Sequence, residues 1–159
     1  SIVPGLFNPD EFHAWLTQTM EIAAELLPDH AIVLKPHPML KLERIQAVLK
    51  HFPGTDAVLS NLHTGILAQN ADVVISHHTS ALLDALAMNP KTVLFMQFTE
   101  HWMAKDPTIC TMFKNIVPRL ATTKAELADH VRRILRGEPT EYSLAEILKH
   151  RENLEPLLR

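Results

Sequence analysis

Two short polar segments carry the side chains of this sequence that are best suited to hold an anion. Residues 35–38 read Lys-Pro-His-Pro, and residues 76–80 read Ser-His-His-Thr-Ser. Ammonium and imidazole groups donate charge-assisted hydrogen bonds to phosphate, and the two prolines restrict the backbone on either side of His37. The first segment therefore predicts a diphosphate contact through Lys35 and His37. The plainer alternative is a strand end with a histidine on the surface.

The second segment leads into a predicted helix, and its hydroxyl groups stand where that helix begins. A helix N-terminus offers N–H groups without intrahelical partners and a partial positive charge, both of which suit a phosphate. We expect Thr79 and Ser80 to bind phosphate there, and His77 or His78 to contact the phosphate or the leaving group. Asp84 lies one helical turn beyond Ser80, where its carboxylate can accept hydrogen bonds from a ribose. The alternative is an ordinary helix cap and a solvated aspartate.

Other chemistries fit these residues less well. Zinc accepts imidazole, but adjacent histidines such as His77 and His78 seldom both reach one ion, and a zinc site needs three or four ligands. Ser80 lacks the Gly-x-Ser-x-Gly surroundings of a hydrolase nucleophile, and Cys110 has no activating partner nearby in sequence. The four glycines are scattered, so neither a P-loop nor a dinucleotide fingerprint is present. We expect no metal and no cofactor.

The elements that must position these segments alternate along the chain. Hydrophobic spacing predicts helices near residues 9–27, 42–52, 62–69, 80–88, 122–136 and 143–159, and strands at 31–34, 57–59, 73–75 and 92–95. A weak strand is expected over residues 2–7, and residues 96–118 read as irregular. The wholly apolar run 31–34 is typical of a strand buried on both faces.

This alternation of strands and helices predicts βαβ units. The expected fold is α/β: a three-layer α/β/α, Rossmann-like domain with a parallel sheet. Ligands of such sheets bind at the carboxyl ends of the strands, so we expect both polar segments at one edge of the sheet.

Composition limits the function classes. A chain of 159 residues fits one domain, so we expect residues 1–159 to form a single nucleotide-binding domain. The net charge of −3 offers no basic field for nucleic acid. A single cysteine fits a reducing compartment. The sequence contains neither an apolar run of membrane-spanning length nor a signal-peptide pattern, which predicts a cytoplasmic location.

The order of these motifs resembles the C-terminal half of GT-B transferases. The resemblance lies in Lys-Pro-His-Pro after a buried strand, and in the strand Ala-Asp-Val-Val-Ile-Ser followed by Thr-Ser-x-x-x-Asp-Ala-Leu. It covers residues 31–97 and is closest to capsule Kdo transferases, bacterial polysialyltransferases and CDP-glycerol glycerophosphotransferases. The serine motif departs from those families, because it reads His-His-Thr-Ser where a Ser-Ser ending is expected.

The resemblance implies a function and a partner set. His37 would be catalytic, assisting departure of the donor nucleotide, while Lys35, Thr79 and Ser80 would hold its phosphate. The donor would be a CMP-, CDP- or UDP-linked sugar or polyol, and the acceptor would be membrane-bound, with the enzyme at the inner face of the membrane. An N-terminal acceptor-binding domain would complete the enzyme, so we expect this chain alone to be nearly inactive. A UDP-sugar 2-epimerase and a non-catalytic nucleotide- or partner-binding module are the alternatives.

Overall fold

The computed structural model describes residues 9–38, 40–77, 79, 81–96, 117–140 and 143–149. The chain divides into two compact units, one ending at His63 and the other continuing from Thr64. We call them the N-terminal unit and the C-terminal unit, and each is described by itself. Within the described ranges, no helix has both the length and the apolar character needed to cross a membrane. The strand expected at residues 2–7 lies outside these ranges.

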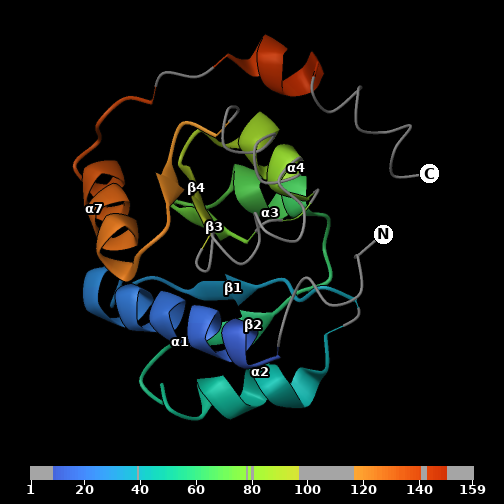
Figure 1. Cartoon of the computed structure of the whole chain (residues 1–159), viewed down its shortest axis with the longest axis vertical. Coiled ribbons are helices and arrows are strands. Elements are labelled where there is room, and N and C mark those ends of the chain that lie inside the picture. Colours follow the sequence, from blue (N-terminus) through green and yellow to red (C-terminus); the bar gives the residue numbers. More distant parts are fainter. Residues whose placement is uncertain are drawn as a thin grey trace. The chain divides into compact units, whose positions relative to one another are not determined.

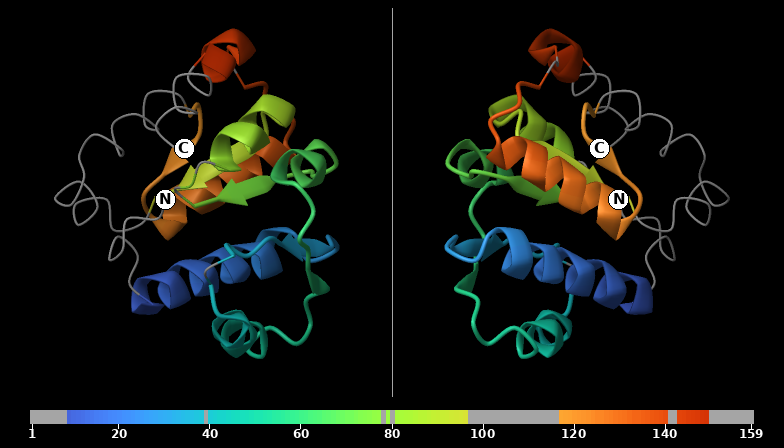
Figure 2. Two further views of the ribbon diagram at one scale, coloured as in Figure 1. Left: turned by 90° about the vertical axis from the view of Figure 1, so that its right-hand side faces the viewer. Right: turned by 90° about the vertical axis from the view of Figure 1, so that its left-hand side faces the viewer.

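The C-terminal unit is a parallel sheet with helices on both faces (Figures 1 and 2). Its strands are β3 (Val74–Ser76), β4 (Thr92–Phe95) and β5 (Leu120–Ala121), paired in the order β3-β4-β5. Helices α3 (Thr64–Gln69) and α4 (Ala81–Met88) pack together on one side, and α7 (Lys124–Leu135) covers the other. All four residues of β4 are buried because both faces of this central strand are covered. The predicted three-layer α/β/α arrangement is confirmed in this unit.

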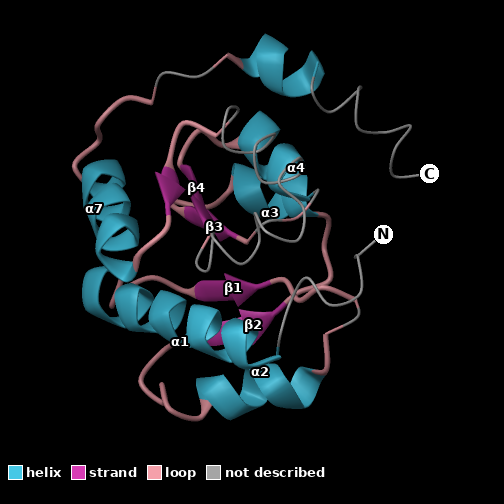
Figure 3. Cartoon of the chain, in the orientation of Figure 1, coloured by secondary structure: helices cyan, strands magenta, loops and turns pink. Residues whose placement is uncertain are grey.

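The N-terminal unit contains two parallel strands and two helices (Figure 3). Strand β1 (Ile32–Leu34) pairs with β2 (Ala57–Leu59), and helix α1 (Pro9–Leu26) packs against α2 (Leu42–Leu49). The helices bury their apolar faces at helical spacing. The most deeply buried of these side chains are Met20, Ile22, Ile45 and Val48. The helix–strand–helix–strand order therefore agrees with the periodicity of the sequence, and the α/β class with parallel strands holds in both units.

One expectation about the strands is wrong, and one strand was not predicted. Strand β1 is not buried on both faces, because Val33 is 48% exposed and its register partner Val58 is 52% exposed. A short apolar run has the same appearance whether one or two faces are covered, so the pattern alone cannot separate the two cases. The structure also contains β5, which the sequence pattern missed. Two residues are too few to show a period, and pairing with β4 defines this strand.

The C-terminal end of α7 is set by Gly137, a residue that the sequence itself marks as a helix break. Gly137 adopts a φ of 76°, and its N–H donates to the Ile134 carbonyl, while the next N–H donates to the Arg133 carbonyl. This is the hydrogen-bond pattern of a helix terminated by a left-handed residue, which favours glycine. A further helical segment is described over residues 144–149, where Ile147 is buried and Leu144 and Leu148 are exposed.

Asn89 joins four elements of the C-terminal unit. Its side chain is buried, and its Nδ2 donates to the carbonyl oxygens of Ala68 (2.7 Å) and Ala71 (2.8 Å). Its Oδ1 accepts from the N–H of Lys91 at 2.9 Å, and its own carbonyl accepts from the Thr92 hydroxyl at 2.7 Å. The amide thereby ties the end of α3 and the approach to β3 to the turn between α4 and β4.

We expect Asn89→Ala to lower the free energy of unfolding by about 2–4 kcal/mol, since it removes the buried amide and leaves the Ala71 carbonyl and the Lys91 N–H without the partner that it supplies. Asn70→Ala is the matched control, because Asn70 is exposed and makes one side-chain bond of 3.2 Å to the Ile66 carbonyl. Urea denaturation of both variants measures the difference. Equal losses in the two variants would contradict the assigned role of Asn89.

Candidate functional site

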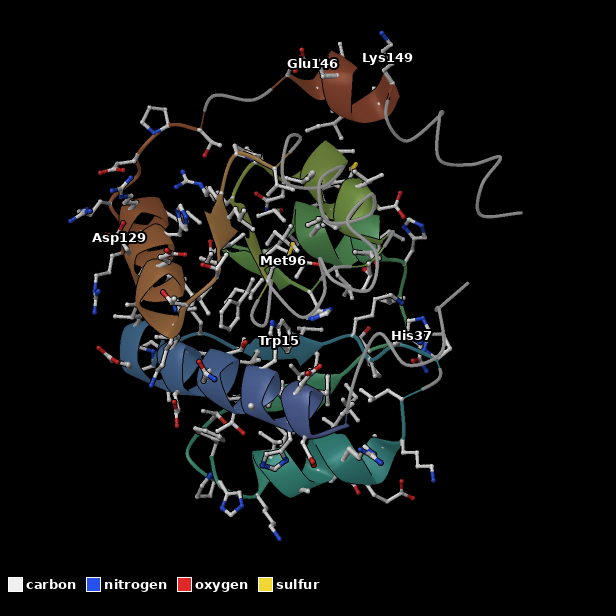
Figure 4. The ribbon with its side chains drawn as sticks, in the orientation of Figure 1. Trp15, His37, Met96, Asp129, Glu146 and Lys149 are labelled. Atoms are coloured by element: carbon white, nitrogen blue, oxygen red, sulfur yellow. The ribbon has the colours of Figure 1, made fainter. Side chains whose placement is uncertain are left out.

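The first candidate segment leaves the carboxyl end of β1. Lys35 and His37 are both exposed, and Figure 4 shows His37 in the segment that follows this strand. The His37 carbonyl accepts a hydrogen bond of 2.9 Å from the N–H of Leu40, so the chain turns directly after the histidine. Pro36 and Pro38 fix φ on both sides of it. The segment therefore presents a cation and an imidazole to solvent from a restrained backbone, at the strand end where parallel sheets bind ligands.

The second candidate segment leaves the carboxyl end of β3 and enters α4. The Ser76 hydroxyl donates to the His77 carbonyl at 2.8 Å, and the Thr79 carbonyl accepts from the N–H of Leu82 at 3.1 Å. Helix α4 begins at Ala81, within one residue of the expected start and two residues after Thr79. Asp84 lies in the first turn of α4 and is half-buried.

The predicted residues fall into two groups. Lys35 and His37 belong to the N-terminal unit, whereas Ser76, His77, Thr79 and Asp84 belong to the C-terminal unit and are brought together by the β3–α4 connection. His78 and Ser80 lie outside the described residues. That both segments serve one ligand stays a prediction from the sequence.

Sequence reasoning overlooked a third segment, residues 60–63, which reads Ser-Asn-Leu-His and follows β2. The Ser60 N–H donates to the Leu34 carbonyl at 2.9 Å, so the chain leaves β2 beside the point where it leaves β1. Asn61 and His63 are exposed there. The only signal in the sequence was the position of these polar residues after a short apolar run.

The start of α7 offers a comparison with the start of α4. The Thr123 hydroxyl accepts from the N–H of Glu126 at 3.2 Å, and Oε2 of Glu126 accepts from the N–H (2.7 Å) and hydroxyl (3.0 Å) of Thr122. This reciprocal arrangement is close to a capping box. It satisfies backbone donors at this end of the helix with the chain's own side chains. The start of α7 is therefore a structural cap and a poor candidate for a phosphate site.

The hydrogen bonds from Thr122 also lower the pKa of the Glu126 carboxyl, with smaller contributions from Thr123 and His130.

Arg119, just before β5, has its own pKa lowered by burial. Its guanidinium donates to the Thr140 hydroxyl (Nε, 3.1 Å) and to the Glu138 carbonyl (Nη2, 3.3 Å). It anchors the segment after α7 at the amino end of the C-terminal unit's sheet, which is the end opposite the β3–α4 connection.

Among the described side chains there is no group of three or more His, Cys, Asp or Glu residues that could hold a metal ion.

Comparison with known proteins identified no relative, because no family model, curated protein or solved structure matches the chain.

The cap at α7 predicts a pH dependence of stability. Because the pKa of Glu126 is lowered on folding, its ionised form stabilises the fold above the ordinary carboxyl range near pH 4.5. That contribution is lost as the pH falls through the folded-state pKa. We expect Glu126→Gln to be less stable than the parent at pH 7, and the difference to shrink below about pH 4.5. Urea denaturation at several pH values measures this, and a difference independent of pH would contradict it.

Proposed function

We propose that this chain is the donor-nucleotide-binding half of a GT-B-type glycosyltransferase or glycerophosphotransferase of bacterial surface polysaccharide synthesis. One observation carries the proposal: in each unit, a segment with phosphate-binding side chains leaves the carboxyl end of a parallel strand. These are the strand ends at which α/β sheets bind nucleotides. The donor would be a sugar or polyol phosphate activated by CMP, CDP or UDP.

The β3–α4 connection supports a phosphate role on physical grounds. Its helix is eight residues long and begins at Ala81, two residues after Thr79, and its amino end adds a partial positive charge. The start of α7 provides the contrast, since a glutamate already occupies that cap. Asp84 would accept hydrogen bonds from ribose hydroxyls.

These residues would act by stabilising negative charge on the leaving phosphate. An acceptor oxygen bonds to the transferred sugar carbon or phosphorus, and the bond to the donor's phosphate oxygen breaks. The nucleotide leaves with that electron pair, so negative charge builds up on its phosphate. Donors placed beforehand at that position lower the barrier. Lys35, His37 and Thr79 would supply them, and His37 would assist departure directly. The acceptor's proton would go to a general base in the acceptor-binding domain.

The proposal includes where the reaction takes place. A surface polysaccharide is built on a membrane-bound acceptor, so the enzyme would act at the inner face of the cytoplasmic membrane as a peripheral protein. A domain that binds donor but lacks the acceptor half should retain nucleotide affinity with little or no transfer.

Calorimetric titration with CMP, CDP, UDP and GDP tests the proposal. We expect the chain to bind a cytidine nucleotide, and His37→Ala, Thr79→Ala or Ser80→Ala each to weaken that binding about tenfold, because each removes a hydrogen bond to a charged phosphate. Thr17→Ala, on α1, is a matched control for the threonine variant and should bind as the parent does.

The pattern of binding separates the alternatives. Preference for UDP would favour the 2-epimerase or another sugar transferase. Nucleotide binding with no transfer, even after an acceptor-binding partner domain is supplied, would favour a non-catalytic module. Absence of binding to all four nucleotides would contradict the proposal.

A further inference from the structure

The carboxyl ends of β1 and β2 form one edge of the N-terminal unit. Leu34 and Leu59 are register partners in the parallel pair, and neighbouring strands lie about 4.8 Å apart. Lys35 and Ser60 are the next residues on the two strands, and the Ser60 N–H donates to the Leu34 carbonyl at 2.9 Å. The segments 35–38 and 60–63 therefore start side by side (Figures 1 and 3).

Both segments carry exposed polar side chains. A turn after β2 is closed by the Leu62 N–H, which donates to the Ser60 hydroxyl oxygen at 3.2 Å. Asn61 and His63 are exposed, as are Lys35 and His37 across the strand pair. An amide and three basic side chains thus stand at one edge of one unit, where a ligand can reach them.

Charge distinguishes this edge from the opposite one. Residues 35–42 and 57–71 contain neither aspartate nor glutamate. In contrast, Asp29 and Asp56 stand just before β1 and β2 at the amino edge, and both are exposed. Lys41 adds a further cation at the start of α2, whose N-cap has no side-chain hydrogen bond. The acidic residue nearest to Lys41 in sequence is Glu43, in the first turn of that helix.

We propose that Asn61 and His63 bind the same phosphate-bearing ligand as Lys35 and His37. The Asn61 amide and the His63 imidazole each supply an N–H donor, and a diphosphate has more acceptor oxygens than Lys35 and His37 can satisfy. This inference rests on the proposed function, and it extends the phosphate contacts proposed for Lys35 and His37 to both segments at the edge after β1 and β2.

Calorimetric titration of the whole chain with inorganic pyrophosphate and with CDP tests this subsite. We expect His63→Gln and Asn61→Ala each to weaken both ligands about tenfold, since each removes one hydrogen bond to a charged group. His51→Gln is the matched control: His51 is exposed in the same unit but lies between α2 and the amino end of β2. It should leave both affinities unchanged. Glu43→Gln, which removes the one acidic side chain in the first turn of α2, should tighten the binding of both ligands.

Imidazole NMR signals give a second measurement on the unaltered chain. Pyrophosphate should shift the ring resonances of His63 and His37 while those of His51 stay in place. If the chain binds CDP and His63→Gln and Asn61→Ala bind it equally well, this inference is overturned and the proposed function stands. If the unaltered chain binds neither CDP nor any other nucleotide, both are overturned.

Discussion

The buried amide of Asn89 is the constraint on which the C-terminal unit most depends. Its Nδ2 donates to the Ala71 carbonyl before β3 and to the Ala68 carbonyl in α3, which also accepts from the Ala71 N–H, and its Oδ1 accepts from the Lys91 N–H. Because one side chain bonds to all three groups, it ties the approach to β3 to the approach to β4, and these two strands pair in parallel.

Buried and exposed polar side chains occupy different strand ends in the two units. In the C-terminal unit, Asn89 and Arg119 stand at the amino ends of the strands and are buried, and their hydrogen bonds go to the protein's own backbone and hydroxyl groups. In the N-terminal unit, Lys35, His37, Asn61 and His63 follow the carboxyl ends of the strands and are exposed. Burying a polar group costs free energy unless its partners are present, so the buried groups are paired within the protein, whereas the exposed ones are accessible to a ligand.

The starts of α4 and α7 show why a hydroxyl before a helix is an ambiguous signal. Both helices follow parallel strands of one sheet, and a hydroxyl residue comes directly before each in sequence, Ser80 before α4 and Thr123 before α7. At α7 the glutamate three residues after Thr123 completes a cap, and its carboxylate accepts hydrogen bonds from Thr122. At α4 the third residue after Ser80 is Leu83, which has no carboxylate. The residue three places along, not the hydroxyl residue itself, separates a closed cap from a candidate phosphate site.

The sequence by itself determined the α/β class and the order of nearly all elements. It also determined the strand ends that carry Lys35, His37, Ser76 and Thr79. These features can be read from the sequence because hydrophobic periodicity and turn residues are local properties. Tertiary structure decided what depends on pairing. It made Leu120–Ala121 a strand, left Val33 half-exposed, and set residues 60–63 beside residues 35–38 through the register of Leu34 with Leu59. Register and burial belong to two segments at once, so neither segment's own residues reveal them.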